Sequence, residues 1–143
     1  MKIRNFKRAF NHVLLNVPES EFSMRCYRRD IAWGDITEEV SLKCNTVGCI
    51  IGHCSILDKP KNFYKFEHFE GWSKHFFGVE QEVIWDFCFS CYWSENKLTS
   101  SKTQALLRLN YIIENKNYPE DFYKDKYKYN LVMPEKELKP YII

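Results

Sequence analysis

The feature of this sequence that most constrains its fold is an uncharged, apolar run at residues 44–54, CNTVGCIIGHC, after which the first charged side chain is Asp58. Plotted at about 100° per residue, positions 46–57 form a helix with no charged face. One stripe of that helix is apolar, a second has almost no side chains, and a third carries a thiol and an imidazole (Val47, Ile50, Ile51, Cys54 and Leu57; Gly48, Gly52 and Ser55; Cys49, His53 and Ile56). We therefore expect a buried central helix that begins near Thr46.

Two glycines inside that expected helix indicate close packing. A glycine in a helix interior costs about 1 kcal/mol relative to alanine, which is tolerable only where a neighbouring element approaches closely. We therefore assign Gly48, Gly52 and His53 to the structural core. For His53 we expect a ring N–H donated to a backbone carbonyl, because buried polar groups need hydrogen-bond partners.

Four further segments have the periodicity of helices. Apolar residues recur at helical spacing from Ile3 to Val17, and Pro18 ends that segment. The other three are residues 69–77 with Gly78 as the stop, residues 83–88, and a helix opened by the capping-box pattern of residues 101–104 with Ala105, Leu106, Leu109, Ile112 and Ile113 facing inward. The alternation of Phe22, Met24 and Cys26 predicts a short two-stranded element near residues 22–28.

Composition supports a helical fold. With only 5 glycines and 5 prolines, the chain has few of the turn residues that sandwiches and barrels need. We predict a mainly α, single small domain of four or five helices around the buried central helix. The helical domain is expected to span residues 1–117. A tail rich in Tyr and Lys, residues 118–143, is expected to pack on the domain or to reach a partner.

The 6 cysteines are predicted to be thiols or metal ligands. No signal peptide or membrane-spanning stretch is visible, so we expect the chain to stay in a reducing cytosol, where disulfides are rare. Cys44, Cys49, Cys88 and Cys91 are candidate ligands of a zinc ion, because Cys88 and Cys91 have the spacing of a zinc knuckle. Their Trp, Phe and Tyr neighbours favour the alternative that they are buried structural thiols.

A thiol-dependent enzyme is a further alternative. Cys49 and His53 stand one helical turn apart, and Cys44 precedes the expected helix N-terminus, which lowers the pKa of a thiol. We prefer structural roles, because no glycine-rich loop accompanies these residues. The sequence also has no phosphate loop, paired-carboxylate signature, Ser-centred elbow or dinucleotide fingerprint.

Charge is uneven along the chain. The net charge of +2 is too small to imply nucleic acid or a membrane surface. Seven basic residues nevertheless precede residue 30, against Glu19 and Glu21 (Lys2, Arg4, Lys7, Arg8, Arg25, Arg28 and Arg29). We interpret them as a solvated face in preference to a phosphate-binding patch. The candidate partner-binding residues are Arg25, Arg28 and Arg29, together with Tyr123, Tyr127 and Tyr129 of the tail.

The run at residues 44–53 resembles a pattern in small, uncharacterised proteins of tailed bacteriophages and their hosts. In those proteins it reads Cys-Gly-Thr, two residues, Cys, two residues and Gly-His, followed by a Trp- and Phe-rich stretch and a Thr-initiated helix. The resemblance covers roughly residues 22–115, and Asn45 stands where the pattern has Gly. Asn also tolerates a left-handed turn, so the turn is expected to survive. The resemblance implies a viral origin and carries no activity with it.

These observations lead to an expected function and two alternatives. We expect a phage-type accessory protein that binds a host or viral protein in the host cytoplasm without catalysis, an inhibitor of a bacterial defence being one form. A virion component is equally compatible with the sequence. The alternatives are a small zinc-stabilised module that binds nucleic acid through Arg25, Arg28 and Arg29, and a thiol-dependent enzyme.

Overall fold

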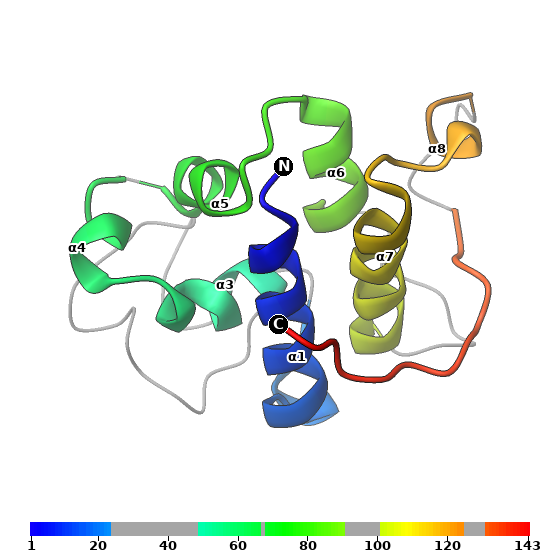
Figure 1. The fold of residues 1–143 in the computed structure, drawn as a ribbon, viewed down its shortest axis with the longest axis horizontal. Helices are drawn as coiled ribbons and strands as arrows, with labels where there is room; N and C mark the ends of the chain where they lie inside the picture. The colour runs from blue at the N-terminus through cyan, green and yellow to red at the C-terminus, as the bar shows by residue number, and fades with distance from the viewer. Residues whose placement is uncertain (24–48, 67, 91–100, 125–130) are drawn as a thin grey trace.

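Helix α1 (Ile3–Asn16) lies in the middle of the computed structural model and packs against α3 (Ile50–Cys54), α5 (Phe69–Phe77) and α7 (Ser101–Asn115) (Figure 1). Its buried residues, spaced three and four apart, form one apolar face (Phe6, Ala9, Phe10 and Val13). The predicted amphipathic first helix is therefore confirmed. The structure describes residues 1–23, 49–66, 68–90, 101–124 and 131–143.

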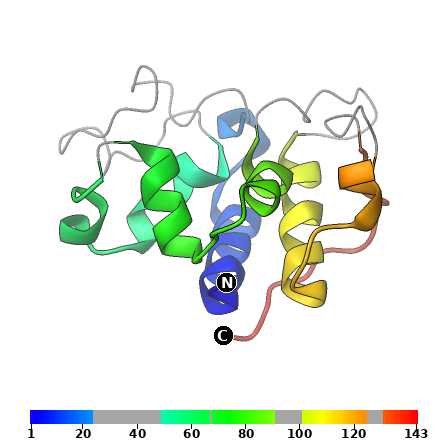
Figure 2. The ribbon, with the colours of Figure 1, turned by 90° about the horizontal axis from the view of Figure 1, so that it is seen from above.

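The remaining elements lie on the two sides of α1. Figures 1 and 2 show α3, α4 (Pro60–Phe63) and α5 on one side, and α7 with α8 (Glu120–Lys124) on the other. Helix α6 (Glu82–Phe89) packs against α7. The part of the chain that the structure describes forms helices and 3₁₀ turns with no extended strand. The prediction of a mainly α, single small domain is confirmed.

The C-terminus of α5 shows why a glycine is needed at position 78. Gly78 has φ 63° and ψ 40°, a left-handed conformation that costs glycine least. Its N–H bonds to the His75 carbonyl at 3.2 Å. A Cβ at this position would lie 2.9 Å from Cγ of Lys2, because the start of the chain packs closely here. The predicted helix stop is thus confirmed.

The predicted central helix is buried, but it is shorter than expected. Cys49 has an extended backbone (φ −84°, ψ −177°), and α3 begins at Ile50 rather than near Thr46. After five residues the chain continues as a 3₁₀ turn, Ser55–Leu57. The Ser55 hydroxyl donates to the Gly52 carbonyl at 3.0 Å, so a side chain satisfies that carbonyl at the end of the α-helix. The predicted burial is confirmed for Ile50, Ile51, Gly52 and Cys54, but Ile56 is 41% exposed and the predicted length is wrong.

Most of the predicted two-stranded element near 22–28 lies outside the described residues. Within them, Phe22 and His68 each form an isolated β-bridge. The same limit applies to Val47 and Gly48, which belong to the predicted start of the central helix.

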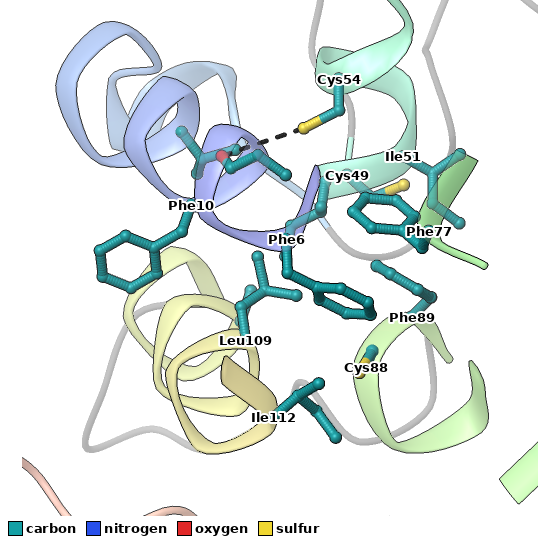
Figure 3. Packing of buried hydrophobic residues seen from close by; sticks show 14 of the residues in the cluster. Phe6, Phe10, Cys49, Ile51, Cys54, Phe77, Cys88, Phe89, Leu109 and Ile112 are labelled. Atoms are coloured by element: carbon teal, nitrogen blue, oxygen red, sulfur yellow. Dashed lines mark hydrogen bonds between the residues drawn. The ribbon is translucent and has the colours of Figure 1, made fainter. Parts of the chain in front are cut away.

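Aromatic rings fill the space among α1, α5 and α6 (Figure 3). The ring of Phe77 lies 4.8 Å from that of Phe6 and 4.7 Å from that of Phe89, measured between centroids. All three side chains are buried. Aromatic pairs at such separations contribute about 0.5–1.5 kcal/mol each beyond the burial of their area. This aromatic cluster joins the start of the chain to α5 and α6.

Candidate functional site

The predicted zinc ligands are only partly within the described residues. Cys49 and Cys88 are buried in the core, whereas Cys44 and Cys91 lie outside the described residues. In Figure 3, Cys49 and Cys88 lie on either side of the Phe77 and Phe89 side chains. No group of three or more His, Cys, Asp or Glu residues suited to a metal occurs in the part that the structure describes. The zinc site stays a prediction that depends on Cys44 and Cys91.

Two of the described thiols are in environments that oppose ionisation. Burial raises the pKa of the Cys54 thiol, and the nearby Cys49 raises it further. Burial also raises the pKa of Cys88, against a smaller opposing effect of Arg108. Because the thiolate is the nucleophilic form, a thiol with a raised pKa is inert at neutral pH. Cys88 therefore acts as a small apolar side chain, and Cys54 as a neutral thiol that donates to the Ala9 carbonyl at 4.0 Å (Figure 3).

His53 makes the contact expected of a structural histidine. Its Nε2 lies 2.7 Å from the carbonyl oxygen of Glu21, and a carbonyl only accepts, so this nitrogen carries the proton. The imidazole also stacks on Phe22, with a centroid separation of 6.2 Å. Gly52, its neighbour in α3, is buried. His53 thus joins α3 to the turn that follows α1.

The predicted partner-binding residues are not placed by the structure. Arg25, Arg28, Arg29, Tyr127 and Tyr129 lie outside the described residues. Tyr123 belongs to α8, but its side chain is outside the description as well. Their roles stay predictions.

A groove that the sequence did not indicate lies between α7, the start of α8 and residues 131–136. It consists of two hollows of about 220 and 400 Å³ that share Tyr111, Met133 and Pro134. Its floor is mainly apolar (Leu107, Tyr111, Pro119, Leu131, Met133 and Pro134). We call it the C-terminal groove. An apolar hollow with polar residues at its edge is the usual form of a binding site.

Side chains of α7 fix the segment that forms one wall of this groove. The Gln104 amide receives the Met133 N–H at 3.0 Å and donates to the Met133 carbonyl at 3.3 Å. Arg108 donates to the Leu131 carbonyl. Between these two fixed residues, Val132 lines the groove and is 45% exposed. The wall therefore presents an apolar side chain in a fixed position.

A second amide holds the chain end on α1. Asn11 receives the Tyr141 N–H at 2.8 Å and donates to the Tyr141 carbonyl at 2.8 Å. The Tyr141 ring packs against Phe10, 5.0 Å between centroids. Figure 1 shows the segment passing along α7 and ending beside α1. Two carboxamides, on α7 and α1, thus bind the backbone of residues 131–143 as a partner strand would.

The guanidinium of Arg108 is buried beneath the groove. It donates to the Phe87 carbonyl at 3.1 Å and lies 5.0 Å and 6.0 Å from the ring centroids of Phe87 and Phe122. Burial lowers the pKa of Arg108 to about 9, and Cys88 opposes that shift. A cation is favourable beside the last carbonyls of α6, where the helix dipole is negative. Arg108 therefore links the end of α6 to the groove wall.

The rim of the C-terminal groove is acidic. Exposed carboxylates stand on all three of its elements, against one lysine (Glu114, Glu120, Asp121, Glu135 and Lys136). Lys136 lies 2.9 Å from Glu114 and is the main cause of the lowered pKa of that carboxyl, since burial opposes the shift. Four carboxylates and one ammonium leave the rim with a net negative charge.

Sequence reasoning missed Arg108, Gln104 and Val132, although one signal was present. Arg108 lies three residues after Ala105 and four before Ile112, so it occupies the inward stripe of α7. A charged residue at such a position is unusual and indicates a specific partner. Nothing comparable in the sequence distinguishes Val132, whose exposure depends on contacts made by its neighbours.

No helix in the described part of the chain is both long and apolar enough to cross a membrane. Comparisons with protein-family models, with curated proteins and with solved structures find no match to this chain. Its function therefore has to be argued from its own residues.

Proposed function

We propose that this chain is a phage-type accessory protein that acts in the host cytoplasm by binding a host or viral protein, without catalysis of its own. Inhibition of a bacterial defence is one form of that role. The observation that supports binding is the C-terminal groove, with Val132 exposed in its wall. The viral origin in this proposal derives from the sequence resemblance at residues 44–53.

The groove is suited to binding because its wall is already ordered. Ordering a loop or side chain on association costs about 0.5–1.5 kcal/mol per immobilised side chain. Here Gln104 and Arg108 fix the residues on both sides of Val132. An apolar side chain exposed in a hollow also gains more from a partner than one exposed on a convex surface, because more of its area is covered.

The zinc alternative depends on residues outside the description, and the thiol-enzyme alternative does so in part. A thiol enzyme would have to rely on Cys44 or on Cys49, and a zinc module on Cys44 and Cys91. Native mass spectrometry with and without a chelator tests the zinc alternative. A mass that corresponds to the chain plus one zinc, lost on chelation, would support it.

Affinity capture from lysates of infected and uninfected bacteria tests the proposal. The bait is the intact chain, compared with Val132→Gln in the groove and with Leu15→Gln on α1 as a matched control. Leu15 is also apolar and exposed, at 63%. We expect one protein to be retained by the wild type and by Leu15→Gln, and to be lost with Val132→Gln. Retention of the same proteins by all three baits would contradict the proposal.

Point substitutions are better baits than a truncation. Removal of residues 118–143 would take away Phe122 and Met133, which are buried, and the Leu131 carbonyl that Arg108 contacts. A truncated chain that loses its partner would then report loss of folding as readily as loss of a contact.

A further inference from the structure

We infer that the partner presents to the C-terminal groove an extended segment that carries Lys or Arg beside apolar residues. This inference rests on the proposed function and specifies its partner. The groove supplies three features that such a segment would match: an acidic rim, an apolar floor and an open stretch of extended backbone.

The charge of the rim favours a basic partner. Glu120 and Asp121 line the larger hollow, and Glu114 and Glu135 line the smaller one together with Lys136, so the charged residues that line each hollow sum to a negative charge. Two of them, Glu120 and Asp121, also stabilise the N-terminus of α8, and Glu114 pairs with Lys136. These local roles leave the net charge unchanged. Over distances within about 10 Å at ordinary salt, that charge attracts a cation and repels an anion.

The hydrogen bonds of the wall indicate that its backbone is extended. The N–H and C=O of Met133 both face Gln104, and the C=O of Leu131 faces Arg108 on the same helix. In an extended chain the backbone groups of successive residues point to opposite sides. The N–H and C=O of Val132 therefore point away from α7.

Those two backbone groups are open to a partner. Within the part of the chain that the structure describes, neither the N–H nor the C=O of Val132 makes a hydrogen bond. Pro134, two residues on, has no N–H to offer, so the open edge is short. Addition of a strand to a short exposed edge is a common mode of peptide recognition, in which backbone bonds give affinity and side-chain hollows give selectivity.

Two ten-residue peptides of opposite charge test the inference. One alternates Lys with Val and the other alternates Glu with Val, so that an extended form of each has one charged and one apolar face. Binding of each labelled peptide to the full chain is measured by fluorescence anisotropy in about 50 mM salt, where surface charges are weakly screened. We expect the Lys peptide to bind at least about tenfold more tightly than the Glu peptide.

Variants of the full chain assign that difference to the groove. Val132→Gln should weaken binding of the Lys peptide by about fivefold, whereas the Leu15→Gln control should leave its affinity unchanged. Glu135→Gln and Asp121→Asn should each weaken binding of the Lys peptide by about twofold. About 0.5 M salt should remove most of the preference for the Lys peptide over the Glu peptide. The Val132 amide should also exchange its hydrogen more slowly when the Lys peptide is bound.

Several results would overturn the inference. They are equal binding of the two peptides, tighter binding of the Glu peptide, binding of neither, and binding of the Lys peptide that Val132→Gln leaves unchanged. If lysate capture still depends on Val132 in any of these cases, the proposed function stands and only the partner's chemistry is wrong. If no protein is captured in a Val132-dependent way, the proposed function fails.

Discussion

The two sides of α1 differ in the balance of contacts that hold them together. On the side of α3, α4 and α5, buried rings pack on one another, as Phe63 does with both Phe69 and Trp72 at centroid distances of 5.4 and 5.2 Å. On the side of α7 and residues 131–143, side-chain amides and a buried guanidinium bind the backbone directly. Polar side chains also contribute on the first side, where the Asn5 amide donates to the Phe76 carbonyl at 2.6 Å and Arg8 donates to the Leu57 carbonyl. Those bonds join the ends of helical segments, whereas on the second side polar groups bind a segment that has no helix of its own.

The difference arises because one side consists of helices and the other includes a segment, residues 131–143, without regular secondary structure. Helices satisfy most of their own backbone groups, so helix packing depends mainly on apolar faces and needs polar partners only at the helix ends. Residues 131–143 have no regular structure of their own, and their backbone groups need partners from elsewhere. Asn11, Gln104 and Arg108 provide these partners. We infer that the polar side exists to position the segment that forms the groove wall.

The largest effect is expected from Phe77→Ala on the aromatic side. It removes a fully buried ring that contacts Phe6, Phe76 and Phe89, so the unfolding free energy should fall by about 3–5 kcal/mol. Urea denaturation measures the loss. Leu15→Ala, at an exposed position, is the control and should change stability by less than about 0.5 kcal/mol. A loss below about 1 kcal/mol for Phe77→Ala would show that the aromatic cluster does not hold the start of the chain to α5 and α6.

Replacement of Arg108 by Met tests the polar side. The variant fills a similar volume but leaves the Phe87 and Leu131 carbonyls without the guanidinium, at a cost of about 2–3 kcal/mol. Hydrogen exchange should become faster at residues 131–136 while it stays unchanged in α5. Arg108→Lys should recover little of the lost stability, because a single ammonium cannot donate to two separate carbonyls as the planar guanidinium does. Equal stability of Arg108→Met and the wild type would show that the guanidinium does not hold the wall.

Substitution of Asp58 is expected to have an intermediate effect on stability, and that effect depends on pH. Its carboxylate accepts hydrogen bonds from the Trp72 indole at 3.0 Å, the Asn62 amide at 3.2 Å and the Lys59 N–H at 2.8 Å. Burial alone would raise the pKa of Asp58, but these bonds outweigh it and hold the pKa below its ordinary value. Asp58→Asn should therefore cost about 1–2 kcal/mol at neutral pH.

The direction of that pH dependence follows from the difference between the folded and unfolded pKa of Asp58. Because the folded pKa is lowered, the unfolded state binds more protons, and the contribution of Asp58 is complete above the unfolded pKa of about 3.9. It is lost as pH falls through the folded pKa. The stability gap between wild type and Asp58→Asn, measured by urea denaturation at several pH values, should accordingly shrink in acid. A gap that widens in acid would contradict this account.

The smallest effect is expected from Lys136→Ala at the groove rim. Lys136 and Glu114 are both about half exposed, and exposed pairs of this kind contribute about 0.2–0.5 kcal/mol. The loss should disappear in about 1 M salt, because the charges are then screened. Thermal unfolding at low and high salt measures it. A loss above about 1 kcal/mol would mean that the rim pair is structural rather than a surface contact.

The contrast between the two sides also decides what the sequence could predict. The helices at residues 3–16, 69–77, 82–89 and 101–115 were predictable, because apolar periodicity and a glycine stop depend on local sequence. The short length of α3 was not, because the extended backbone of Cys49 delays the start of the helix to Ile50 in a run whose apolar pattern continues unbroken. The groove was not predictable either, because it requires residues 131–136 to meet α7, a contact between distant parts of the chain.

The central claim is that the C-terminal groove binds a protein, and photo-crosslinking tests it most directly. A photoreactive phenylalanine analogue is placed at position 132 in one chain and at position 15 in another, and each is irradiated in the lysate used for capture. The account predicts that the captured protein crosslinks through position 132 and does not crosslink through position 15. Crosslinking through position 15 with none through position 132 would contradict it.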